Sequence, residues 1–65
     1  MNMDKQTRIL WKVVIADEEY ITKAYTKSEA VNNAALRHAD YIGKPVALTR
    51  WLMNEGKIDY YTERV

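Results

Sequence analysis

The chain has 65 residues, enough for one small domain with one thin hydrophobic core. Hydrophobic residues make up 48% of the sequence and charged residues 29%, which is typical of a globular chain and excludes a disordered one. The formal net charge of +1 at pH 7 provides no broad field that would steer the chain onto a polyanion. The absence of cysteine excludes disulfides and thiolate metal sites, which stabilise many small domains. Binding to a partner or to a second copy of the chain remains as a way to stabilise the small core.

Residues 1–6 are polar and are expected to form a lead to a single domain over residues 7–65. No apolar run approaches the ~20 residues that a membrane-spanning helix needs. The first residues are polar rather than signal-like. A cytosolic protein is therefore predicted.

Two strands joined by an acidic turn are predicted at the start of the domain. The segment from Thr7 to Ala16 alternates large apolar side chains with mixed ones, a pattern that indicates a strand. Its apolar face carries Ile9, Trp11, Val13 and Ile15. Asp17 to Glu19 form the turn, and Tyr20 to Tyr25 resumes a β-rich pattern. The two segments predict an antiparallel hairpin.

A helix is predicted from Lys27 to Ile42 because both of its ends are marked. Thr26 and Glu29 have the spacing of a capping box at the N-terminus. Gly43 suits a left-handed residue after the last turn, and Pro45 prevents continuation. An apolar stripe on the helix consists of Ala30, Val31, Ala34, Ala35, His38, Ala39, Tyr41 and Ile42.

The remaining residues are interpreted as a second hairpin. Val46 to Met53 is taken as a third strand, residues 54–56 as its turn, and Lys57 to Arg64 as a fourth strand. The order ββαββ predicts an α+β fold, in which a four-stranded antiparallel sheet has one helix packed on one face. The favoured strand order is 2-1-3-4, because strands 1 and 3 are the most apolar.

A single helix covers only one sheet face, so the opposite face is expected to be open. The assumed register places on this face Leu10, Lys12, Val14, Thr49, Trp51, Met53 and Tyr61. Because Tyr and Trp are enriched at interfaces, a protein-contact role is predicted, with a homodimer among the possible assemblies. The proposed contact residues are Trp51, Tyr61, Met53, Leu10 and Lys12, with Leu36 and the Asp17 to Glu19 turn as secondary candidates. A register slip of one residue would place Trp11 outside in place of Trp51.

Two alternatives remain open for this face, and a third possibility for the whole chain is a purely structural subunit whose sheets pair edge to edge or face to face. In the first alternative it is an ordinary solvated face, since antiparallel sheets commonly leave one face exposed to water. In the second it is a platform for single-stranded nucleic acid, on which aromatic side chains stack bases and basic ones meet phosphates. The candidates for that platform are Trp51, Tyr61, Trp11, Lys12, Arg50 and Arg8. Asp59 and Glu63 on the last predicted strand weigh against it.

No catalytic, cofactor or metal site is predicted. His38 is the sole histidine, and its place in the apolar stripe favours packing against Val31 or Ile42 over a general-base role. No nucleophile or carboxylate pair with helical spacing accompanies it. Gly43 and Gly56 are isolated turn glycines rather than a phosphate-binding loop. A non-enzymatic protein is therefore predicted.

The layout from Trp11 to Val65 resembles small ββαββ proteins of unknown function from bacteria and their phages. The residues that carry the resemblance occupy caps, turns and packing positions: Tyr25, Thr26, Ser28, Glu29, Ala30, Ala34, Ala39, Gly43, Lys44, Pro45, Val46 and Gly56. Phages encode many proteins of this size that bind and block a host protein, anti-CRISPR proteins among them. The resemblance implies an antidefence inhibitor that acts in the host cytoplasm by occluding a host protein.

Overall fold

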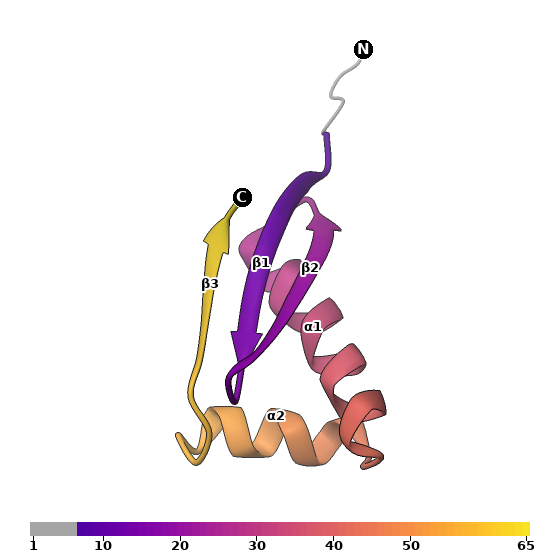
Figure 1. Ribbon diagram of the computed structural model, residues 1–65, viewed down its shortest axis with the longest axis vertical. Helices are drawn as coiled ribbons and strands as arrows, with labels where there is room; N and C mark the ends of the chain where they lie inside the picture. Colours follow the sequence, from indigo (N-terminus) through magenta and orange to yellow (C-terminus); the bar gives the residue numbers. More distant parts are fainter. Residues whose placement is uncertain (1–6) are drawn as a thin grey trace.

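The computed structural model describes residues 7–65, so the predicted lead over residues 1–6 lies outside the described residues. Three strands form one antiparallel sheet in the order β2-β1-β3, and two helices follow each other between β2 and β3 (Figure 1). The elements are β1 (Ile9–Ile15), β2 (Glu18–Ala24), α1 (Lys27–Ile42), α2 (Val46–Asn54) and β3 (Tyr60–Arg64). No helix within residues 7–65 is long and apolar enough to cross a membrane.

The predicted four-stranded ββαββ fold with one helix is wrong. The third predicted strand, Val46 to Met53, is helix α2, and the fourth is shortened to β3, which pairs with β1. The strand order 2-1-3-4 is therefore replaced by β2-β1-β3. A short apolar run fits a strand or a buried helix equally well. Burial in α2 follows the helical period, because Val46, Thr49 and Met53 face inward at spacings of three and four residues.

The turn between β1 and β2 consists of only two residues. Ala16 and Asp17 have φ values of 50° and 69°, as a type I′ hairpin turn requires. Ile15 then pairs with Glu18, so the predicted acidic turn is displaced and Glu18 and Glu19 begin β2. This short turn fixes the register of the whole hairpin.

Helix α1 has the predicted bounds and both predicted ends. The Glu29 amide donates to Thr26 Oγ1 (3.1 Å), while Glu29 Oε1 accepts from the Tyr25 amide (2.8 Å), one residue before the expected cap amide. Gly43 is left-handed at φ 70°, and the Lys44 amide donates to the Ala39 carbonyl, completing a Schellman motif.

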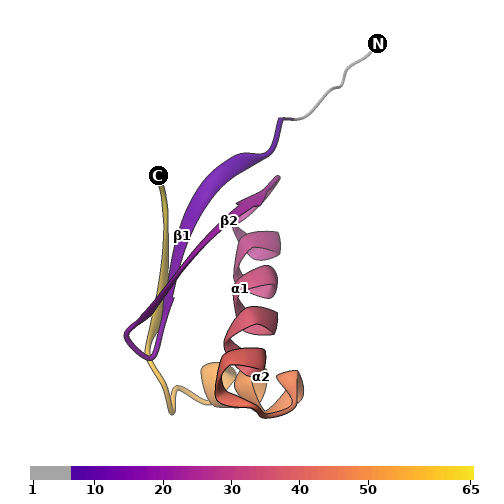
Figure 2. The same cartoon turned by 45° about the vertical axis from the view of Figure 1, so that its right-hand side comes forward.

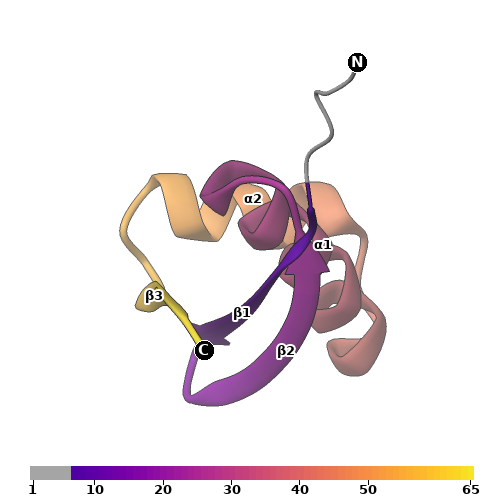
Figure 3. The same cartoon turned by 90° about the horizontal axis from the view of Figure 1, so that it is seen from above.

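The core lies between the sheet and α1. Trp11, Val13 and Ile15 point from β1 toward the helix, which offers small side chains in return. The alanines buried on α1 are Ala30, Ala34, Ala35 and Ala39. They allow the helix to approach the sheet closely along β1 and β2, while α2 crosses below and packs on α1 (Figure 2). Seen from above, β2 and β3 form the two edges of the sheet, with β1 between them (Figure 3).

Candidate protein-contact surfaces

One face of the sheet points away from both helices, and we call it the open face. Side chains alternate along a strand, so residues that neighbour the buried Trp11, Val13 and Ile15 point outward. The cross-strand register then assigns to the open face Leu10, Lys12, Val14, Glu19, Ile21, Lys23, Tyr61 and Glu63. Leu10, Ile21 and Tyr61 are 40%, 42% and 55% exposed.

Four apolar side chains form a band across the open face, and we call this band the open-face patch. It consists of Leu10, Ile21, Val14 and Tyr61. Val14 lies directly opposite Tyr61 on β3. Ile21 lies opposite Lys12, so it is the diagonal neighbour of both Leu10 and Val14. The patch therefore crosses all three strands without interruption.

The four charged groups on the open face sum to zero, and two of them form an ion pair. Lys12 Nζ lies 2.8 Å from Glu63 Oε2 on the neighbouring strand. The hydrogen bond and the negative charge of Glu63 raise the pKa of Lys12, while desolvation opposes them. The other two charged groups on this face, Glu19 and Lys23, also have opposite signs. The face is thus apolar and close to neutral.

The structure divides the predicted contact residues among different places. Leu10, Lys12 and Tyr61 lie together on the open face, as predicted. Trp51 lies instead on α2, 50% exposed, with Lys57 Nζ 5.9 Å from its ring centroid. Met53 is 8% exposed and packs in the core instead of lying on the open face. Both departures have one cause, which is that the segment carrying these two residues is a helix rather than a strand.

Among the secondary candidates, Leu36 and Asp17 lie away from the open-face patch, whereas Glu19 lies on the open face opposite Val14. Leu36 is 48% exposed on α1. Asp17, Glu18 and Glu19 are exposed at the tip of the β1–β2 hairpin. None of these residues adds to the continuous apolar surface of the sheet.

Ile21 is the member of the open-face patch that the sequence analysis missed. Tyr20 and Ala24 are buried against α1, so Ile21 points to the opposite face. The two-residue turn at Ala16 and Asp17 fixes which residues of β2 share a face with Leu10 and Val14, and Ala-Asp is not a pair that marks such a turn in a sequence.

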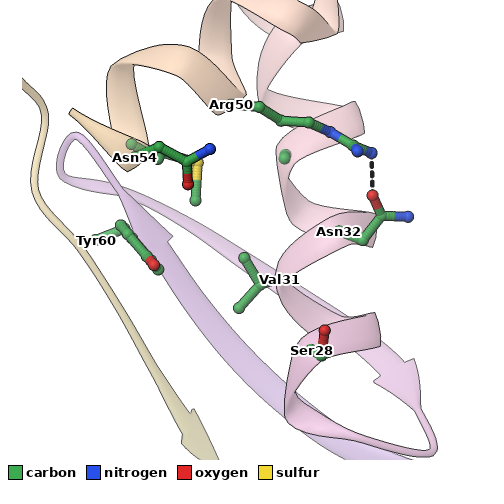
Figure 4. A pocket seen from close by; sticks show the side chains of 8 residues that line it. Ser28, Val31, Asn32, Arg50, Asn54 and Tyr60 are labelled. Atoms are coloured by element: carbon green, nitrogen blue, oxygen red, sulfur yellow. Dashed lines mark hydrogen bonds between the residues drawn. The ribbon is translucent and has the colours of Figure 1, made fainter. Parts of the chain in front are cut away.

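A groove separates α1 from β3, because α1 packs mainly on the other two strands. One part of it, next to α2, has a volume of about 240 Å³, with Tyr60 and Val31 on opposite walls (Figure 4). The remaining lining residues there are Ser28, Asn32, Ala35, Arg50, Met53 and Asn54. A second part, next to the start of α1, is lined by Lys27, Ser28, Val31, Tyr60, Tyr61 and Thr62. Arg50 hydrogen-bonds Asn32 across the gap between α2 and α1.

His38 is buried against Tyr20 of β2, a contact that the predicted packing against Val31 or Ile42 did not include. Its Nδ1 atom lies 2.6 Å from the Tyr20 hydroxyl, and the two rings meet edge to face at 5.6 Å. Only 4% of His38 and 7% of Tyr20 are exposed. The pair therefore joins α1 to β2 in the interior.

Compared with protein-family models, curated proteins and solved structures, the chain matches none of them. Within residues 7–65, no three His, Asp or Glu side chains are grouped so that they could hold a metal ion.

Proposed function

We propose that the chain is a non-enzymatic protein-binding module that contacts a partner protein through the open face of its sheet. The observation that carries this proposal is the open-face patch, in which three half-exposed side chains from three strands are continuous through Val14. Burying a large aliphatic or aromatic side chain contributes about 1.5–3 kcal/mol before entropy costs. Each of these three side chains is about half exposed and would contribute part of that amount, so the patch would form the apolar centre of a larger contact.

The balanced charges of the open face favour a protein over a nucleic acid as partner. A nucleic-acid platform needs unpaired cations beside its aromatic groups so that phosphates can replace counterions. Lys12 is instead engaged by Glu63, and the two exposed aromatic residues of the original hypothesis, Trp51 and Tyr61, belong to different elements. Occlusion of a host protein by a phage-encoded inhibitor is a narrower form of the same proposal.

A capture experiment with matched variants tests the proposal. The tagged chain is compared with an Ile21→Lys/Tyr61→Lys double variant and with Leu36→Lys, which changes an equally exposed apolar residue on α1. We expect bound proteins to be retained by the wild type and by Leu36→Lys and to be lost from the double variant. Far-UV circular dichroism checks that all three chains are folded. Equal retention by the double variant would overturn the open-face proposal.

A second measurement separates the nucleic-acid alternative. Binding of single-stranded oligonucleotides is titrated with salt, because phosphate contacts make log affinity fall linearly with log salt concentration. We expect no binding at low salt. Tight binding that weakens steeply with salt and that is lost in Lys12→Ala would favour the nucleic-acid platform instead.

A further inference from the structure

The two edges of the sheet differ in how their backbone groups are satisfied. At the β2 edge, Arg37 donates to the Ile21 carbonyl at 2.6 Å and Asn33 donates to the Lys23 carbonyl at 3.4 Å. Both donors come from α1, four residues apart, so the helix occupies this edge with its own side chains. Such protection is a common way to keep an edge strand from pairing with another chain.

The β3 edge has no such protection within the described residues. The Val65 amide donates to the Leu10 carbonyl, and the Ala16 amide donates to the Asp59 carbonyl. These two bonds show that the odd-numbered residues from Asp59 to Val65 direct their backbone groups toward β1. Backbone groups in an antiparallel pair alternate in direction, so those of Tyr60, Thr62 and Arg64 point away from β1. No hydrogen bond between residues 7–65 reaches them from outside the sheet.

We propose that a second copy of this chain pairs with β3 along this edge, antiparallel and with Thr62 on the two-fold axis. The register places Thr62 opposite Thr62 of the second copy, Tyr60 opposite Arg64, and Tyr61 opposite Glu63. No two like charges lie directly opposite each other, and Arg64 can stack on the facing Tyr60 ring. The sequence of β3 is thus complementary to itself.

Thr62 supplies a second observation for this register. Its Oγ1 atom is buried and has no hydrogen-bond partner among the described residues. At the two-fold axis the two Thr62 side chains are neighbours, and a change of rotamer that turns each enclosed hydroxyl toward the edge lets the pair hydrogen-bond across the antiparallel strands. The pairing joins two three-stranded sheets into one of six strands, with β3 and its copy at the centre. It is formed by backbone groups of the edge and does not depend on the proposed function, although Tyr61 of the open-face patch lies beside the new pairing.

Proline substitution tests the pairing without removing the monomer fold. Thr62→Pro deletes an outward N–H, and proline is tolerated in an edge strand at such a position. Lys23→Pro is the matched control, because the Lys23 N–H also points outward, on the protected β2 edge. Sedimentation from micromolar to millimolar concentration should show a dimer for the wild type and Lys23→Pro, and a monomer for Thr62→Pro with unchanged far-UV circular dichroism. A monomeric wild type, or a Thr62→Pro dimer, would overturn the proposal.

A cysteine variant tests the register itself. The chain has no cysteine, and facing residues of a hydrogen-bonded antiparallel pair lie about 5.5 Å apart at Cα, within disulfide range. Thr62→Cys should therefore oxidise to a covalent dimer much faster than Leu36→Cys, whose side chain is exposed on α1. Equal rates would contradict the Thr62-centred pairing, even for a chain that is dimeric by sedimentation.

Discussion

The Tyr20 hydroxyl on β2 and Nδ1 of His38 on α1 are joined by a 2.6 Å hydrogen bond in the interior of the protein. Arg37 lies over the outer side of the same tyrosine ring, 5.5 Å from its centroid, and donates to the neighbouring Ile21 carbonyl. The polar side chains of α1 thus hold the helix to β2 at a point where its small alanines contribute little contact area.

Removal of the Tyr20 hydroxyl is expected to destabilise the fold. Tyr20→Phe leaves the buried Nδ1 of His38 without its partner, which costs about 1–3 kcal/mol. Urea denaturation followed by circular dichroism measures the change in the free energy of unfolding. Tyr61→Phe serves as the control, since its hydroxyl belongs to an exposed residue on the open face and its loss should be nearly neutral. Equal stability of Tyr20→Phe and wild type would contradict this prediction.

The same hydroxyl predicts how stability depends on pH in the alkaline range. Burial raises the pKa of Tyr20, the negative charge of Glu18 and the nearby Tyr41 add to the rise, and Arg37 opposes it. The folded state therefore favours the protonated phenol, whose stabilisation is complete below the unfolded pKa of about 10 and is lost as pH rises through the folded pKa. Unfolding free energies above pH 10 should fall more steeply for wild type than for Tyr20→Phe. Parallel curves would contradict a raised pKa.

Substitution by valine is expected to change the stability of the protein in opposite directions at two threonines, one on α2 and one at the start of α1. Thr49 is fully buried on α2, and its Oγ1 has no partner within the described residues. Thr49→Val keeps the shape, relieves the desolvated hydroxyl and should stabilise the protein by about 1 kcal/mol. Thr26→Val removes the side-chain cap of α1 and should destabilise it by about 1 kcal/mol. Thermal unfolding of both variants measures the two signs, and a destabilised Thr49→Val would show that its hydroxyl is satisfied.

The β1–β2 turn carries backbone strain that substitution can relieve. Ala16 and Asp17 both have positive φ, which costs a residue with a side chain about 1–2 kcal/mol in the left-handed region. Asn-Gly is the preferred pair for this turn type. The Ala16→Asn/Asp17→Gly variant should therefore have a higher midpoint in urea with an unchanged slope. A lower midpoint would mean that this turn does not adopt the type I′ geometry.

The two tryptophans are predicted to differ in their access to solvent. Trp11 is 9% exposed and its Nε1 donates to the Ala24 carbonyl, whereas Trp51 is 50% exposed on α2. In the Trp51→Phe variant Trp11 is the remaining tryptophan, so its fluorescence emission should lie at shorter wavelength and resist quenching by acrylamide. Emission from Trp11→Phe should lie at longer wavelength and be quenched readily. Equal quenching of the two would contradict helix α2, since its face determines the exposure of Trp51.

Sequence patterns predicted the elements whose ends are set by local chemistry. Helix α1 begins at the Thr26 cap and ends at the left-handed Gly43 because these groups satisfy free backbone amides and carbonyls nearby in the chain. Strand β1 followed from the alternation of large apolar residues, and its inward face was assigned correctly. Leu10, Lys12 and Tyr61 were therefore placed on a common open face.

The segment from Val46 to Asn54 shows where sequence reasoning stopped. Nine residues with apolar side chains at many positions fit a strand period and a helix period alike. No side-chain cap marks its start, since Pro45 has none to offer. The local sequence therefore did not distinguish helix from strand, and Trp51 and Met53 were assigned to the wrong surface.

By itself the sequence determined the length of α1, the buried face of β1 and the composition that requires a single small core, because capping and alternation act between residues close in the chain. The tertiary structure decided that Val46–Asn54 is a helix, that β3 pairs with β1, and that Ile21 joins Tyr61 on the open face. Those outcomes depend on which apolar surfaces are still uncovered after α1 has packed on β1 and β2. Residues that are distant in the sequence make up these surfaces, so local sequence patterns do not reveal them.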